Sequence, residues 1–140
     1  MASQAAGYSG RSLAQKLGVK PGARLAFIGA PEGWSIDGLP EGVAHTDEPV
    51  GPFDIAVWFL RSRADLTSRV VEVSGRLLPK SSIWVAWPRR AGGHTSDITE
   101  QGIRDVVLPL GLVDVKVAAL DDDWSGLKFV WRVSKRSALG

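Results

Sequence analysis

Apolar runs alternate with amphipathic segments along the chain, and this alternation predicts an α/β fold. The runs at residues 23–29, 53–60 and 81–88 are largely apolar and are bounded by glycine, proline or charged residues. Short apolar runs of this kind are typical of strands that are buried on both faces of a sheet. Residues 42–46 predict a further, brief strand within a stretch rich in glycine, proline and acids.

Three segments show the spacing of amphipathic helices. The first begins at Ser12, whose side chain we expect to cap the helix together with Gln15, and it ends at Gly18. The second spans residues 62–79, and the third begins at about Thr99. The apolar stripes that we expect to face the sheet are Leu66, Val70, Val73 and Leu77 in the second helix, and Ile103, Val106 and Leu110 in the third.

The last two apolar runs, at residues 112–120 and 127–133, are separated by a turn sequence at 121–126. A connection this short joins antiparallel neighbours. Strands that alternate with helices predict a mostly parallel sheet with helices on both of its faces. We therefore expect an α/β domain with such a sheet and an antiparallel hairpin at its C-terminal end.

Composition limits the classes of protein that the chain can belong to. With 140 residues, 44% of them hydrophobic, it is long enough for one domain with its own core. We place this domain at residues 11–135, with flexible segments at 1–10 and 136–140. The lack of cysteine excludes disulfides and thiolate metal sites. Because we see no apolar leader or membrane-spanning run, we expect a cytoplasmic protein without membrane contact.

Charge is unevenly distributed, although the net charge is only +2. Basic and acidic segments follow one another along the chain. This pattern produces either a basic patch for an anionic ligand or neighbouring segments that neutralise each other. A chain with so little net charge is not expected to bind nucleic acid.

Several stretches resemble known families. GVKPGARLAFIGAPEG at 18–33 and FDIAVWFL at 53–60 are similar to the opening strand, loop and central strand of S-adenosylmethionine-dependent methyltransferases. The order of elements resembles a shortened form of that Rossmann-like fold. WVAWPRR at 84–90 and WSGLKFV at 124–130 resemble a narrower bacterial family, the domain of unknown function 3052. This second resemblance covers most of the chain and implies no settled activity.

The opening loop departs from the pattern that the methyltransferase resemblance implies. Gly29 and Gly33 occupy the outer positions of Gly-x-Gly-x-Gly, but Pro31 lies between them. Proline has no N–H donor and a fixed φ, so we interpret this loop as a degenerate turn. The resemblance also implies an acid after the second strand, which Asp47 or Glu48 could supply. We therefore predict no cofactor and keep S-adenosylmethionine as the alternative.

We expect any ligand site at the carboxyl ends of the strands, where the connections diverge to opposite faces of the sheet. Arginines beside tryptophan suit an anionic or planar group. The alternative is that these arginines are solvated or are paired with acids such as Glu32 or Asp97. No residue is assigned a catalytic or metal-binding role. The candidate binding residues are Gly29, Glu32, Gly33, Trp34, Arg61, Arg63, Trp87, Arg89, Arg90 and His94.

The six tryptophans divide into two groups. Those inside predicted strands are expected in the core, and those at strand ends or in turns are better placed for a ligand or a partner. The first group is Trp58, Trp84 and Trp131, and the second is Trp34, Trp87 and Trp124. The acidic run at 121–123 lacks the spacing of a calcium loop, so we expect a solvated hairpin tip there.

Three functions fit this sequence. We favour a non-catalytic or regulatory binding module for an anionic small molecule or a protein partner. The second hypothesis is a minimal S-adenosylmethionine-dependent methyltransferase that tolerates Pro31 in its loop. The third is an interaction module, or an oligomer, that pairs through the C-terminal hairpin with Trp124 as a contact.

Overall fold

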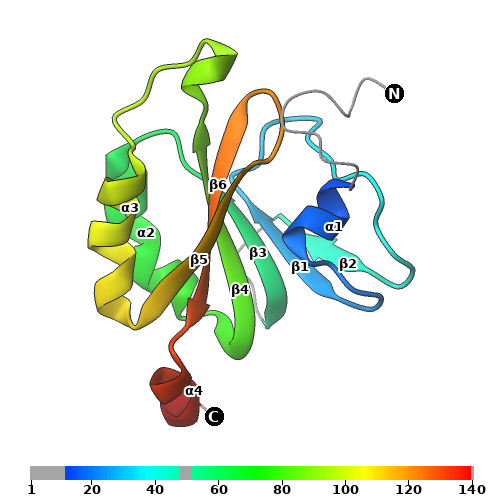
Figure 1. Ribbon diagram of the computed structural model, residues 1–140. Coiled ribbons are helices and arrows are strands. Elements are labelled where there is room, and N and C mark those ends of the chain that lie inside the picture. The colour runs from blue at the N-terminus through cyan, green and yellow to red at the C-terminus, as the bar shows by residue number, and fades with distance from the viewer. Residues whose placement is uncertain (1–11, 48–51, 140) are drawn as a thin grey trace.

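The computed structural model describes residues 12–47 and 52–139, with Ala91 and residues 137–139 described in their backbone only (Figure 1). The segment 1–10, which we expect to be flexible, lies outside the described residues. In chain order the elements are α1 (Leu13–Leu17), β1 (Arg24–Ile28), β2 (Ala44–Thr46), β3 (Phe53–Phe59), α2 (Arg63–Ser74), β4 (Leu77–Pro88), α3 (Glu100–Val107), β5 (Leu112–Ala119), β6 (Trp124–Trp131) and α4 (Val133–Leu139), with short 3₁₀ turns at Arg90–Gly92 and Leu108–Leu110.

The strands form a six-stranded mixed sheet in the order β2-β1-β3-β4-β6-β5. The first four strands of this order run parallel to one another. Strand β6 pairs antiparallel with both β4 and β5. The predicted α/β class and the order of helices and strands are therefore confirmed.

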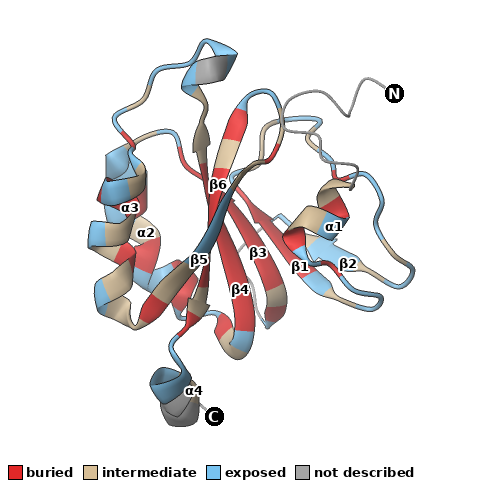
Figure 2. Ribbon diagram, viewed as in Figure 1, coloured by how far each residue is buried: buried red, intermediate tan, exposed pale blue. Residues whose placement is uncertain are grey.

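Each face of the sheet has its own apolar core. Figure 2 shows that many of the buried residues lie in the strands. Helices α2 and α3 cover one face with the predicted stripe residues Leu66, Val70 and Ile103. Helix α1 and the connection after β1 cover part of the other face, through Leu17 and Ile36. The predicted core tryptophans are confirmed: Trp58, Trp84 and Trp131 are all buried.

Helix α1 begins and ends as its sequence predicts. The Ser12 hydroxyl accepts a hydrogen bond from the Gln15 backbone N–H at 3.2 Å, and the Gln15 side chain accepts one from the Ser12 N–H at 3.0 Å. Gly18 ends the helix with a φ of 82°, a conformation that glycine adopts without a steric penalty. Both ends of this five-residue helix are therefore capped.

Helix α2 is shorter than predicted, and β4 is longer. The helix ends at Ser74 and Gly75, and Leu77 is the first residue of β4 rather than part of the helical stripe. The buried Ser81 hydroxyl donates to the Phe53 carbonyl oxygen at 2.7 Å and accepts from the Leu78 N–H at 2.8 Å. This side chain bridges the register shift between β3 and β4. Residues after Gly75, which the sequence predicts to be helical, therefore join the sheet.

Two further differences lie near the C-terminus. Strand β6 begins at Trp124, three residues earlier than the predicted start at Leu127, because the turn is confined to the residues between Ala119 and Trp124. The chain from Val133 to Leu139 forms α4, where the sequence predicts no helix.

An ion pair joins β1 and β3 at their amino ends. The Arg24 guanidinium contacts the Asp54 carboxylate at 3.0 Å, and both side chains are half-exposed. Chiefly through its hydrogen bond to Asp54, Arg24 lowers the pKa of that carboxyl from its ordinary value. A lowered pKa in the folded state contributes stability above the ordinary value of the unfolded chain, and that contribution is lost as the pH falls. Because the pair is exposed, solvent screening keeps its contribution small.

We predict that Ser81→Ala destabilises the fold by about 1–3 kcal/mol, because it leaves the Phe53 carbonyl and the Leu78 N–H without their shared partner. Chemical denaturation measures this change in the free energy of unfolding. The control is Ser68→Ala on the exposed face of α2, which we expect to change stability by less than about 0.5 kcal/mol. Equal effects of the two substitutions would contradict this account of the bridge.

Candidate functional site

The connections after β1 and β3 leave the sheet on opposite faces. Trp34 and Ile36, in the connection after β1, pack into the core of the α1 face, whereas α2 follows β3 on the other face. Because β1 and β3 are neighbours, the carboxyl ends of these strands form a topological switch point, the usual ligand position in open α/β sheets. Three adjoining hollows lie along this edge of the sheet.

The first hollow lies beyond the carboxyl ends of β1 and β2, and we call it the β1/β2 hollow. Its cavity volume is about 380 Å³, at the small end of the range for ligand pockets. The ring of His45 stacks on Phe27 with centroids 5.2 Å apart and an interplanar angle of 29°. The residues on which our argument depends are Phe27, Glu32, Gly33, Trp34, His45 and Asp47.

The two glycines of the opening loop have different roles. A Cβ on Gly29 would lie 3.0 Å from the Phe59 carbonyl oxygen, so this glycine is needed for the close approach of β3. A Cβ on Gly33 would meet nothing within 4 Å, which leaves its backbone open at the hollow. The Pro31 carbonyl accepts from the Trp34 N–H at 3.0 Å and closes a turn. Residues 29–43, all described, contain no helix.

Trp34 connects this loop to the hairpin turn between β5 and β6. Its indole Nε1 donates to the Asp121 Oδ2 atom at 3.1 Å. Its ring packs edge-on against Phe27, with centroids 5.4 Å apart, and against Phe59, at 4.7 Å. Phe59 in turn packs edge-on against Trp124 at 4.9 Å. A continuous aromatic row therefore runs from the β1/β2 hollow to the start of β6.

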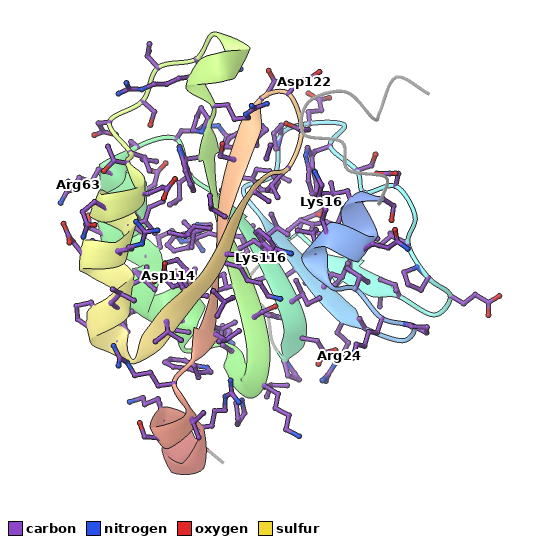
Figure 3. All side chains as sticks on the ribbon, viewed as in Figure 1. Lys16, Arg24, Arg63, Asp114, Lys116 and Asp122 are labelled. Carbon is purple, nitrogen blue, oxygen red and sulfur yellow. The ribbon has the colours of Figure 1, made fainter. Side chains whose placement is uncertain are left out.

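The acidic hairpin turn is more than the solvated tip that we predict from its sequence. The Asp121 Oδ1 atom accepts from the backbone N–H groups of Asp123 and Trp124, both at 2.8 Å. Asp122 is exposed at the end of the turn (Figure 3). Trp124, the partner contact of the third hypothesis, is only 8% exposed and packs in the core of the α1 face.

Two of the candidate arginines bind backbone carbonyls of this structure. Arg61 Nη1 donates to the Gly29 carbonyl at 3.0 Å, and its guanidinium lies 5.4 Å from the centroid of the Trp124 ring. Arg89 Nη1 donates to the Asp121 carbonyl at 3.1 Å. The alternative that Arg89 pairs with Glu32 or Asp97 is therefore not what the structure shows.

His94, Arg63 and Arg90 lie at the surface. His94 Nε2 lies 2.8 Å from Asp123 Oδ1, which gives this histidine the partner that its sequence context does not reveal. Arg63 and Arg90 are exposed, and the Arg63 backbone N–H donates to the Asp97 carboxylate at 2.8 Å. The Arg63 side chain points away from the sheet in Figure 3.

The three hollows divide the predicted residues among themselves. The β1/β2 hollow holds Glu32, Gly33 and Trp34, and a second hollow of about 400 Å³ holds Arg61 and His94. A third hollow of about 410 Å³, at the carboxyl end of β4, holds Trp87, Arg89 and Arg90. Gly29 and Arg63 line none of the three.

The stacked pair of Phe27 and His45 in the β1/β2 hollow is not predicted from the sequence. The sequence predicts that Phe27 is a core residue of the first strand, and it indicates no partner for His45. The register of the parallel pair places Leu25 opposite His45, which brings the imidazole beside the ring of Phe27. The second strand has only three residues, and its sequence gives no signal of its register against the first strand.

A comparison of the chain with protein-family models finds no match, and a comparison with curated proteins finds no similar one. Among the described residues, no helix is both long and apolar enough to span a membrane. The same residues contain no group of three histidine, cysteine, aspartate or glutamate side chains placed to hold a metal ion.

We predict that Asp121→Ala destabilises the protein by about 2 kcal/mol, because it removes the acceptor of the Trp34 indole and of two backbone N–H groups. Asp122→Ala removes the same charge from the same turn and is the matched control, with an expected change below about 0.5 kcal/mol. Chemical denaturation compares the two free energies of unfolding. A loss in Asp122→Ala as large as that in Asp121→Ala would show that the acidity of the turn, and not the Asp121 hydrogen bonds, is what matters.

Proposed function

We propose that the protein is a non-catalytic binding module whose ligand site is the β1/β2 hollow. The proposed ligand is a small molecule with a planar ring and hydroxyl groups, such as a nucleoside. One observation carries this proposal: the stacked Phe27–His45 pair and the Asp47 carboxylate line the same hollow as the opening turn.

The chemistry of the hollow fits such a ligand. The faces of His45 and Trp34 offer stacking surfaces for a planar ring. The Asp47 carboxylate is exposed and is an acceptor for hydroxyl groups. Because Gly33 has no Cβ, a ligand can approach its backbone closely.

The same hollow disfavours a phosphate-bearing ligand. No helix begins after β1 within residues 29–43, so the opening loop does not lead into a helix N-terminus that could bind phosphate. Pro31 contributes no N–H donor, and the carboxylates of Glu32 and Asp47 repel anions. These features favour an uncharged or cationic ligand in the hollow, and they support the interpretation of the opening loop as a degenerate turn.

The anionic ligand that we expect at the arginines has weaker support. Arg89 is already bound to the hairpin turn and Arg61 to the opening loop. Of the arginines in the third hollow, Arg90 is exposed.

A minimal S-adenosylmethionine-dependent methyltransferase is the second candidate. Asp47 favours it, because this acid follows β2 and reaches the hollow of the opening loop, where the resemblance implies a partner for ribose hydroxyls. The parallel order β2-β1-β3-β4, with β6 running antiparallel between β4 and β5, also agrees with a shortened, Rossmann-like methyltransferase fold. Membership of the domain of unknown function 3052 family is part of the same proposal and adds no activity.

Calorimetric titration tests the proposal with adenosine, S-adenosylhomocysteine and S-adenosylmethionine. We predict saturable binding of adenosine that Asp47→Asn weakens about tenfold, since a hydrogen bond to a charged group contributes about 1.5–3 kcal/mol. Glu41→Gln is the matched control: it removes one exposed carboxylate that does not line the hollow, and it should leave the affinity unchanged.

The outcomes separate the two candidates. Binding of adenosine without transfer of a methyl group from S-adenosylmethionine to any acceptor supports the binding module. Methyl transfer in the presence of S-adenosylmethionine would replace it with the methyltransferase. Absence of heat with all three compounds at millimolar concentration would overturn both.

A further inference from the structure

A row of side chains crosses β4, β6 and β5 on the α1 face, away from the three hollows. In the sheet register Trp84 lies opposite Lys128, and Lys128 lies opposite Lys116. Directly paired residues of antiparallel strands point to the same face of the sheet. Figure 3 shows Lys116 on the side of β5 that faces α1, and Lys16 on α1 itself.

Both lysines of this row lie against one ring. The Lys116 ammonium is 5.8 Å from the centroid of the Trp84 ring, and the Lys128 ammonium is 5.9 Å from it. Lys16 of α1 lies at the end of β5, where its Nζ donates to the Ala119 carbonyl at 3.2 Å. We call Lys116, Lys128 and Trp84 the lysine cluster.

Among the ion pairs of the described residues, none includes Lys116 or Lys128. Asp114, the nearest acid along β5, pairs with Arg104 of α3 at 3.0 Å and so faces the opposite side of the sheet. Burial, and secondarily the charge of Lys116, lowers the pKa of the Lys128 ammonium from its ordinary value.

The ring beneath these lysines lies in the core of the sheet. Trp84 is fully buried, and its indole Nε1 has no hydrogen-bond partner among the described residues. A Cβ on Gly126 would lie 3.0 Å from the Trp84 ring, so this glycine leaves the space that the ring occupies. A Cβ on Gly18 would lie 3.8 Å from Lys128 Nζ, which places this ammonium beside the end of α1.

We propose that the lysine cluster binds a small phosphate-bearing anion. The two ammonium groups over the Trp84 ring repel each other. An anion bound between them is attracted to both ammonium groups and so offsets this repulsion. Phosphate groups suit this arrangement because they present several acceptor oxygens and about two negative charges, and lysine binds them as a point charge. This site is separate from the β1/β2 hollow, whose carboxylates repel the same ligand.

Inorganic pyrophosphate is the probe, titrated at low ionic strength by calorimetry and by NMR of the ¹⁵N-labelled Trp84 indole. We expect saturable binding of one pyrophosphate per chain, with a shift of the Trp84 indole signal and a steep loss of affinity with added salt. Lys116→Met with Lys128→Met should weaken binding at least tenfold. Methionine keeps an apolar stem over Trp84, so this variant retains the cover of the ring.

The matched control is Lys20→Met with Lys80→Met, two exposed lysines outside the cluster, which lowers the net charge by the same amount. We expect it to bind pyrophosphate like the unmodified protein, and Lys116→Arg with Lys128→Arg to retain binding. Equal weakening in the two methionine variants would overturn the proposal, because it would show attraction to net charge only. No binding at low salt, or binding without a shift of the Trp84 indole signal, would also overturn it.

Discussion

The carboxylate of Asp121 joins parts of the chain that are far apart in sequence. One of its oxygens accepts two backbone N–H groups and orders the hairpin turn, and the other accepts the indole N–H of Trp34. The backbone carbonyl of the same residue accepts from Arg89 at the end of β4. The opening loop, the end of β4 and the hairpin turn therefore take their positions from one residue.

This constraint changes the interpretation of the charged edge of the sheet. Arg61 and Arg89 read as ligand-binding residues, yet each uses its guanidinium to bind a backbone carbonyl. In the β1/β2 hollow, by contrast, the acidic side chains are the carboxylates of Glu32 and Asp47. On the same face, across β3, the lysine cluster has the opposite charge. The two proposed sites thus select ligands of different charge on one side of one sheet.

Most of the fold could be predicted from the sequence because its signals are local. The cap at Ser12, the glycine stop at Gly18 and the buried strand at 53–60 each need only neighbouring residues. The boundary between α2 and β4 could not be predicted, because it depends on the hydrogen bond from Ser81 to Phe53 in another strand. Local helical spacing continues past Gly75 to Leu77, which instead pairs with Phe53 in the sheet.

The candidate site was predicted less well, for the same physical reason. Its position at the carboxyl ends of the strands follows from the order of elements, but the roles of its side chains depend on contacts between distant segments. Trp124 lies beside a turn in the sequence and yet is buried, because the aromatic row from Phe27 through Trp34 and Phe59 reaches it. Asp47 gains its place only when β2 pairs with β1.

The central claim is that, of the three hollows, the β1/β2 hollow is the ligand site. The most direct test is an NMR titration of the ¹⁵N-labelled protein with adenosine, in which the tryptophan indole signals are assigned by Trp→Phe variants. We predict that the Trp34 signal shifts in a saturable manner while the signal of Trp87, in the third hollow, stays in place. A saturable shift of Trp87 with no change at Trp34 would contradict the claim.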